Sequence, residues 1–241
     1  MQISPELKER IQLVLIVAIL VSGTRLAYVL YERHESAIEH AKKATPPLNP
    51  DYYVTPKKLY PFDLKSAHQL TQQPVWAKVG YAYTYYSYDS VHHHVEFSHE
   101  AGKPLPIEKL QIKDVVTADT PQSPGELQVM AVFEKDGKPY AFSIGSVKDG
   151  TYKFYSDDML FIEDPHDLYK HWPAEVWEAI DKHQVKPGMS ELQTDFAIGL
   201  GIPESSGQPG NRTVNYPNGG NPLSVTYQDD KAAEIKPGSP S

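Results

Sequence analysis

The chain has 241 residues, a formal net charge of −8 at pH 7 and no cysteine. Hydrophobic residues make up 40% and charged residues 22%, a composition typical of globular proteins that excludes a fully disordered chain. An acidic chain gains nothing from counterion release at phosphates, so we expect no nucleic-acid partner. The absence of cysteine excludes disulfides, thiolate metal sites, cysteine nucleophiles and lipid anchors linked to cysteine.

A long apolar run covers residues 11–31, IQLVLIVAILVSGTRLAYVLY, after a short polar segment at residues 1–10. As a helix this run measures about 31 Å, which matches the hydrocarbon core of a bilayer. We therefore predict a single-pass transmembrane helix that contacts lipid. Arg25 then reaches the headgroups, and Tyr28 and Tyr31 lie at the interface.

Two other interpretations of this run stay open. A cleaved signal peptide would use Lys8 and Arg10 as its basic region and residues 21–23 as its cleavage site, which would release a secreted protein. A buried helix of a soluble domain is the third interpretation. The positive charges do not favour a cytoplasmic amino end, but the β-rich region that follows favours export. We therefore expect a membrane protein with most of its chain on the periplasmic side.

The remainder of the chain predicts an α+β fold with several regions. Residues 32–62 are expected to form a polar helical stalk and then a proline-rich linker, because closely spaced prolines keep a chain extended. Residues 63–165 carry strand patterns separated by Asp-Gly pairs, which is typical of an antiparallel β domain. Residues 166–236 are expected to form a module of helices followed by a β-hairpin, with strands at 212–216 and 223–228. Residues 237–241 are a predicted disordered tail.

A helix start is encoded within residues 185–203, VKPGMSELQTDFAIGLGIP. Ser190 and Gln193 form a Ser-x-x-Gln capping box, and Gly199 is placed to end the helix. With the strands that follow, residues 177–235 resemble the SmpA/OmlA/BamE-type lipoprotein domain. That resemblance rests on five residues: Gly188, Met189, Ser190, Gln193 and Gly199.

The match to this family is partial. Pro203 falls about two residues later than the family spacing, and the lipobox cysteine is missing. A transmembrane anchor would then replace the lipid. The resemblance implies a BamE-like module of helices and strands that binds other envelope proteins and does not catalyse a reaction.

A histidine cluster lies in a predicted β-hairpin, formed by residues 75–88 and 91–98. Alternation along the second strand would place His92, His94 and Glu96 on one face. Two histidines and a carboxylate so arranged can bind zinc or copper. The alternative is an exposed hairpin face on which the histidines pair with tyrosines of the neighbouring strand.

The first strand of that hairpin is rich in tyrosine. Tyr81, Tyr83 and Tyr85 would fall on one face, with Tyr86 and Tyr88 on the other. Rows of tyrosine are common in binding faces and equally common in cross-strand packing. Tyr81, Tyr83 and Tyr85 are therefore a candidate interaction surface, with plain packing as the alternative.

An acidic stretch, Asp157–Asp167, could perform acid/base chemistry, although turns and helix caps explain Asp157 and Asp164 without it. Nucleophile elbows, phosphate loops and zinc-protease motifs are absent from the sequence. We therefore predict a protein without cofactor or enzymatic activity that binds envelope or membrane proteins as a scaffold, assembly factor or accessory subunit. The alternative is a metal-binding or hydrolytic periplasmic domain that uses the histidine hairpin and the acidic stretch.

Overall fold

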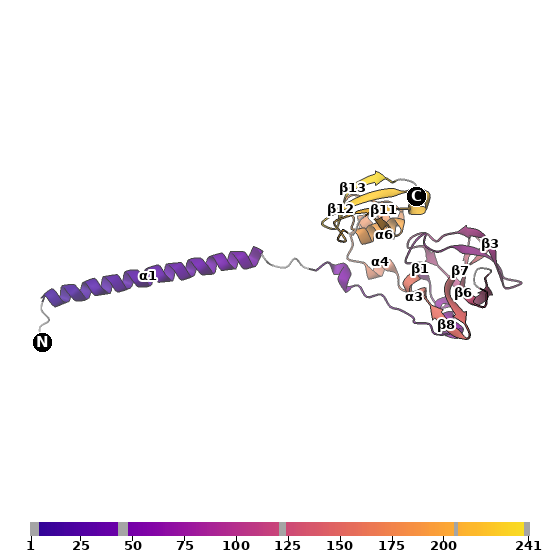
Figure 1. Cartoon of the computed structure of the whole chain (residues 1–241), viewed down its shortest axis with the longest axis horizontal. Helices are drawn as coiled ribbons and strands as arrows, with labels where there is room; N and C mark the ends of the chain where they lie inside the picture. Colours follow the sequence, from indigo (N-terminus) through magenta and orange to yellow (C-terminus); the bar gives the residue numbers. More distant parts are fainter. Residues whose placement is uncertain (1–4, 43–47, 121–123, 205–206, 239–241) are drawn as a thin grey trace. The chain divides into compact units, whose positions relative to one another are not determined.

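The structure is a computed structural model that describes residues 5–42, 48–120, 124–204 and 207–238. The chain divides into two compact units, residues 1–49 and residues 50–241, and Figure 1 shows the elements of both. The architecture is mixed α+β with antiparallel sheets, as the sequence predicts. Parts of the predicted amino-terminal segment (1–4), linker (44–47) and tail (239–241) lie outside the described residues.

The first unit contains one continuous helix, α1 (Pro5–Lys42). It includes the apolar run and the stalk, so the helical form predicted for both is confirmed as far as Lys42. Among the residues that the structure describes, no helix combines the length and the apolar character that a membrane crossing requires. The transmembrane helix predicted over residues 11–31 is therefore not supported. Charged residues lie at both ends of α1, and Arg25 interrupts its apolar part.

The largest sheet of the second unit has the strand order β3-β2-β7-β6-β5, with β8 also paired to β7. Its turns follow the predicted chemistry, since both residues of Asp136-Gly137 and of Asp149-Gly150 have positive φ angles, as tight hairpins require. The six strands are β2 (Tyr85–Asp89), β3 (His94–Gly102), β5 (Ile112–Asp119), β6 (Leu127–Lys135), β7 (Lys138–Lys148) and β8 (Thr151–Phe154).

A small sheet joins three short strands that are far apart in the sequence, in the order β4-β1-β9. They are β1 (Val75–Ala77), β4 (Lys109–Leu110) and β9 (Leu160–Phe161). The strand predicted over residues 75–88 is therefore wrong in its continuity, because β1 and β2 belong to different sheets. The chain turns away between them at Gly80, where any Cβ would lie 2.3 Å from Pro106, and at Tyr81, whose φ is 60°.

Short helices connect these sheets. Asp63 precedes α2, where its side chain and that of Ser66 form a capping box. Asp164 caps α4 by accepting a hydrogen bond from the His166 N–H. These helices are η1 (Pro50–Tyr53), α2 (Leu64–Ala67), η2 (His68–Thr71), α3 (Ser156–Met159) and α4 (Pro165–Leu168).

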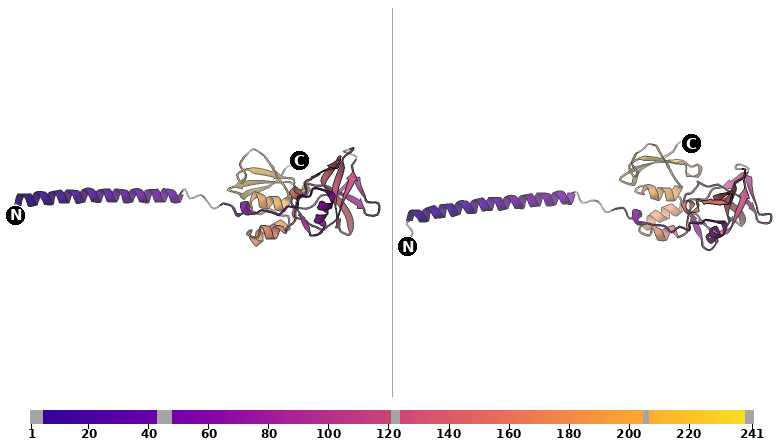
Figure 2. Two further views of the ribbon diagram at one scale, coloured as in Figure 1. Left: turned by 90° about the horizontal axis from the view of Figure 1, so that it is seen from below. Right: turned by 60° about the horizontal axis from the view of Figure 1, so that its bottom comes forward.

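The carboxyl-terminal part contains α5 (Ala174–Asp181), α6 (Glu191–Ile198) and a four-stranded sheet in the order β10-β11-β12-β13. The capping box of Ser190 and Gln193 begins α6 as predicted, and Gly199 ends it with a φ of 84°. In Figures 1 and 2 the yellow strands lie on one side of the orange helix α6. The strands are β10 (Ile202–Pro203), β11 (Thr213–Tyr216), β12 (Leu223–Gln228) and β13 (Lys231–Pro237), with η3 (Asn218–Gly220) after β11.

Strand β13 was not predicted from the sequence, and the predicted tail begins at its last residue, Pro237. The turn before it is Asp229-Asp230, and both aspartates have positive φ angles of 50° and 58°. Aspartate tolerates this left-handed conformation better than most residues, because its short side chain can bond nearby backbone groups. The predicted hairpin is therefore part of a larger sheet.

The two predicted parts, residues 63–165 and 166–236, are joined because strands β1 and β9 of the first part contribute side chains to both hydrophobic cores. On β1, Val75 is buried in the core under the large sheet, whereas its neighbour Trp76 is buried with the carboxyl-terminal helices. On β9, Leu160 and Phe161 divide in the same way. The small sheet β4-β1-β9 therefore separates the two cores, one on each of its faces, and we call it the wall. Residues 50–241 form one compact unit.

The Gly199→Ala substitution is expected to lower the free energy of unfolding by about 1–3 kcal/mol, because Gly199 combines a φ of 84° with a ψ of 174°. An added Cβ would also lie 2.9 Å from the Gly80 carbonyl oxygen. Urea unfolding can be followed by tryptophan fluorescence, because Trp76, Trp172 and Trp177 lie in one core.

Gly188→Ala is the matched control, since Gly188 has a similar φ of 88° but open space around its Cβ position. It should cost less than Gly199→Ala. Equal or smaller destabilisation by Gly199→Ala would contradict the close approach of the two backbones.

Candidate functional site

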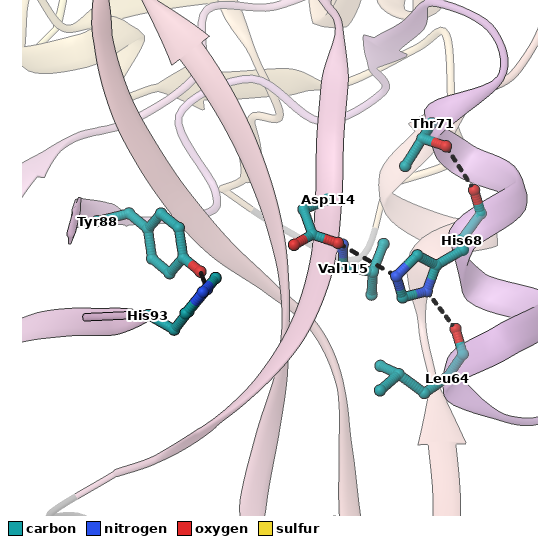
Figure 3. Close-up of polar contacts among 7 residues, drawn as sticks. All are labelled: Leu64, His68, Thr71, Tyr88, His93, Asp114 and Val115. Carbon is teal, nitrogen blue, oxygen red and sulfur yellow. Dashed lines mark hydrogen bonds and ion pairs between the residues drawn. The ribbon is translucent and has the colours of Figure 1, made fainter. Parts of the chain in front are cut away.

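The histidine cluster lies at the turn of the β2–β3 hairpin and not along one strand. His93 has a φ of 52°, and β3 begins only at His94, so alternation does not relate His92 to His94 and Glu96. His92 Nδ1 lies 2.7 Å from Asp89 Oδ2. The phenol of Tyr88 lies 3.1 Å from His93 Nδ1, as Figure 3 shows. The predicted face of three ligands is therefore wrong in its geometry.

Two of the predicted metal ligands, His92 and Glu96, have other partners in this hairpin. Glu96 accepts a hydrogen bond from the Ser98 N–H, and its bonds with Ser98, followed by the nearby His94 and His99, lower the pKa of its carboxyl group. Among the described residues, no group of three or more histidines and carboxylates is arranged to hold a metal ion. The metal site stays a prediction that this geometry does not support.

A histidine that sequence reasoning did not single out connects η2 to the large sheet. His68 Nδ1 lies 2.7 Å from the Leu64 carbonyl oxygen, and Nε2 lies 3.1 Å from Asp114 Oδ1 on β5 (Figure 3). Asp114 also accepts the Val115 N–H. His68 therefore fixes a helix against a strand, which is a structural role.

The acidic stretch binds the proline-rich segment. The carboxylate of Asp157 accepts the backbone N–H groups of Leu59 and Tyr60 at 3.0 and 2.9 Å. Glu163 accepts the backbone N–H of Lys57 at 2.9 Å and pairs with its ammonium at 2.8 Å. Both carboxylates are thus engaged by backbone N–H groups of residues 57–60, and these contacts give no support to a hydrolytic site. Residues 57–60 of the predicted linker are instead part of the second unit and are held against the rest of it.

The contact with Lys57 depends on pH. Hydrogen bonds from Lys57 hold the pKa of Glu163 below its ordinary value. A carboxyl group with a lowered pKa in the folded state stabilises that state at neutral pH, and the contribution is lost as the pH falls through the lowered value.

Near the start of the same segment, Asp51 accepts the indole N–H of Trp172 at 2.7 Å.

The three tyrosines of the candidate interaction surface have different positions. Tyr85 is buried in the core of the large sheet, so packing is its role. Tyr81 and Tyr83 lie in the loop between β1 and β2 and line two separate hollows of the surface. Strand alternation holds only from Tyr85 onward, where Tyr86 and Tyr88 face the opposite side of the sheet.

The first hollow, which we call the sheet-gap cavity, opens where one edge of β7 is divided between two partners. Strand β2 pairs with Tyr140–Phe142 and β8 pairs with Gly145–Lys148, so neither strand covers Ser143. The cavity has a volume of about 310 Å³. Its lining residues are Ala82, Tyr83, Thr84, Tyr86, Phe97, Thr120, Gln128, Met130, Ser143 and Tyr155.

A polar network crosses the sheet-gap cavity. The hydroxyl of Ser143 donates to Gln128 Oε1 at 2.7 Å and lies 3.2 Å from the phenol oxygen of Tyr155. The aromatic wall is formed by Tyr86 and Phe97, whose rings meet edge to face with their centroids 5.1 Å apart. This combination of apolar walls and a few fixed polar groups is typical of small-molecule sites.

The second hollow, which we call the Tyr81 groove, has a volume of about 380 Å³. Leu200 and Ile202 lie along it with 54% and 65% of their surfaces exposed. A further hollow continues beyond Ile202 and Pro217 toward Leu223. The groove is lined by Gly80, Tyr81, Ala82, Ile198, Gly199, Leu200, Gly201, Ile202, Pro217 and Asn218.

A half-buried carboxylate of α6, Asp195, lies beside the carboxyl-terminal sheet. Burial, together with the neighbouring charge of Glu191, raises the pKa of Asp195 to about 7, although a hydrogen bond from Tyr216 opposes this shift. The phenol oxygens of Tyr216 and Tyr227 lie 2.8 Å apart. Glu191 pairs with Arg212. These contacts join α6 to the carboxyl-terminal sheet, which is a structural role.

No protein-family model, curated protein or solved structure matches this chain.

Replacing Asp157 by alanine is expected to release residues 57–60 from the second unit. Hydrogen bonds to charged groups contribute about 1.5–3 kcal/mol, so the Leu59 and Tyr60 amides should exchange with solvent at least about tenfold faster. Hydrogen exchange measured by NMR or mass spectrometry tests this. Asp167→Ala, an exposed carboxylate of the same stretch, is the control that should leave exchange at Leu59 and Tyr60 unchanged. Unaltered protection in Asp157→Ala would refute the docking.

Proposed function

We propose that this chain is a membrane-attached protein of the cell envelope that binds other proteins, as a scaffold, assembly factor or accessory subunit. The observation that carries the proposal is the Tyr81 groove, with its two exposed aliphatic side chains. Large apolar side chains that gather around a hollow on a protein surface mark interaction sites more often than isolated ones do.

The chemistry of the Tyr81 groove favours an apolar partner segment. Tyrosine is the one ionisable side chain among its lining residues, and burial raises the pKa of Tyr81, so its phenol stays neutral. Leu200 and Ile202 stand on either side of Gly201, just beyond the end of α6. A partner protein that inserts aliphatic or aromatic side chains would bury both residues without leaving a charge unpaired.

Attachment to a membrane through α1 is the second part of the proposal. At about 100° per residue, Leu15, Leu20 and Val21 point in three different directions from the helix axis. All three are more than half exposed in the first unit. A stretch of helix with apolar side chains in three directions favours an apolar environment around it, and lipid would supply one. A single-pass anchor with the bulk of the chain on the periplasmic side is the form expected from the sequence.

The resemblance to the SmpA/OmlA/BamE-type domain is also part of this proposal. Its support is local and comes from the capping box of Ser190 and Gln193, the glycine end of α6 and the strands that follow. A module of this kind binds envelope proteins, which agrees with a non-catalytic role for the Tyr81 groove.

The membrane anchor predicts that the full chain remains in the vesicle pellet after extraction with alkaline carbonate. Ile19→Asp places a charge near the middle of the apolar run, which costs about 2.5–3.5 kcal/mol in a bilayer. It should move much of the protein into the soluble fraction. Ile202→Asp, outside α1, is the matched control and should stay in the pellet. Release of the unmodified chain by carbonate would contradict the proposed membrane anchor.

The Tyr81 groove predicts site-specific crosslinking in native membranes. A photoreactive amino acid at position 200 or 202 is expected to capture the same partner protein. At position 91 it should not, although Val91 is 81% exposed, because Val91 lies in a hairpin turn outside the groove.

A competing substitution makes this experiment decisive. Ile202→Asp should weaken capture from position 200 at least tenfold, because it places a charge in the apolar contact. Identical capture from positions 91, 200 and 202, or capture of this chain alone, would rule out the groove as a docking site for another protein.

A further inference from the structure

The sheet-gap cavity has a chemistry that protein docking at the Tyr81 groove does not explain. None of its lining residues carries an aspartate, glutamate, lysine, arginine or histidine side chain. Burial raises the pKa of Tyr83, so its phenol is a neutral donor at physiological pH. A charged ligand would therefore lose its hydration without gaining an opposite charge, and the cavity selects against it.

Three polar groups of the cavity lack a protein partner. The phenol of Tyr83, the hydroxyl of Thr84 and the amide nitrogen of Gln128 make no hydrogen bond to any of the residues that the structure describes. Gln128 is held from its other end, because its Oε1 accepts the Ser143 hydroxyl. Its amide nitrogen is thus fixed in position by the protein while both of its hydrogens are available.

The arrangement combines hydroxyl and amide groups with one aromatic wall. Tyr86 and Phe97 present their rings on the side of β2 and β3, and Ser143 and Tyr155 lie across the divided edge of β7. A sugar ring has the complementary surface, since its C–H groups pack on aromatic rings while its hydroxyls donate and accept hydrogen bonds. Its neutrality also fits the absence of charged lining residues.

We propose that the sheet-gap cavity binds a neutral sugar unit, stacked against Tyr86 and Phe97 and hydrogen-bonded by Gln128, Thr84 and Tyr83. A volume of about 310 Å³ lies at the lower end of the range for ligand pockets, which suits one or two sugar rings and excludes a larger ligand.

The test is a binding titration on the full chain, kept in a detergent without a sugar headgroup so that the detergent cannot occupy the cavity. Cellobiose and N,N′-diacetylchitobiose are the neutral probes, measured by saturation-transfer NMR and calorimetry. At least one should bind with a Kd of about 1 mM or below. Glucose and glucuronate form a matched pair, and glucuronate should bind at least tenfold more weakly because its carboxylate has no cation to pair with.

Variants connect binding to the cavity. Gln128→Glu keeps the side-chain shape but replaces the free amide donors by a charge, and should weaken binding of the neutral probe at least tenfold. Thr84→Val, which removes one hydroxyl, should weaken it as well and covers the case in which Gln128→Glu fails to fold. Ser146→Ala, on the same strand as Ser143 but outside the cavity, should bind like the unmodified chain.

Three results would overturn the proposal. One is that neither disaccharide binds at concentrations well above the expected Kd, and another is that glucuronate binds as tightly as glucose. The third is that folded Gln128→Glu and Thr84→Val both bind the neutral probe as tightly as the unmodified chain. Because these titrations contain no partner protein, their failure is distinct from failure of the crosslinking at the Tyr81 groove.

Discussion

The small sheet β4-β1-β9 is the constraint on which the second unit depends. All residues of β1 and β9 are buried, and their alternating side chains enter two different cores. Trp76 and Phe161 pack with the carboxyl-terminal helices, while Val75 and Leu160 pack under the large sheet. Neither core is closed without this wall, so the β-rich part and the helix-rich part fold as one body. The same wall fixes where the loop between β1 and β2 begins.

Local chemistry made much of the fold predictable. Asp-Gly turns, the capping boxes at Asp63 and Ser190, and the glycine end of α6 each depend on residues within four positions of one another, and each is present. The break between β1 and β2 was not predictable in this way, because β1 is defined by its pairing with β4 and β9. An apolar, aromatic stretch such as residues 75–88 has the same local pattern whether it is one strand or two.

The candidate sites were predictable only in part. Tyr81 and Tyr83 were singled out from the sequence and do line hollows, but through a loop rather than through a shared strand face. Gln128, Ser143 and Tyr155 have no local motif, since the register of β6, β7 and β8 brings them together. Likewise, the carboxylates of Asp157 and Glu163 resembled a catalytic stretch in sequence. Their role as acceptors for the docked segment depends on contacts about a hundred residues away.

The wall also has a consequence for the order in which the molecule assembles. The hairpins β6–β7 and β7–β8 close over two-residue turns, so their loop-closure entropy is small and they can form early. Strand β1 pairs with β9, which follows all strands of the large sheet in the chain. Before this pairing forms, Val75, Trp76, Leu160 and Phe161 are not yet buried in their two cores. We expect closure of this late pairing to limit the rate of folding. A chain stopped before that step would expose these four apolar side chains to aggregation or to a chaperone.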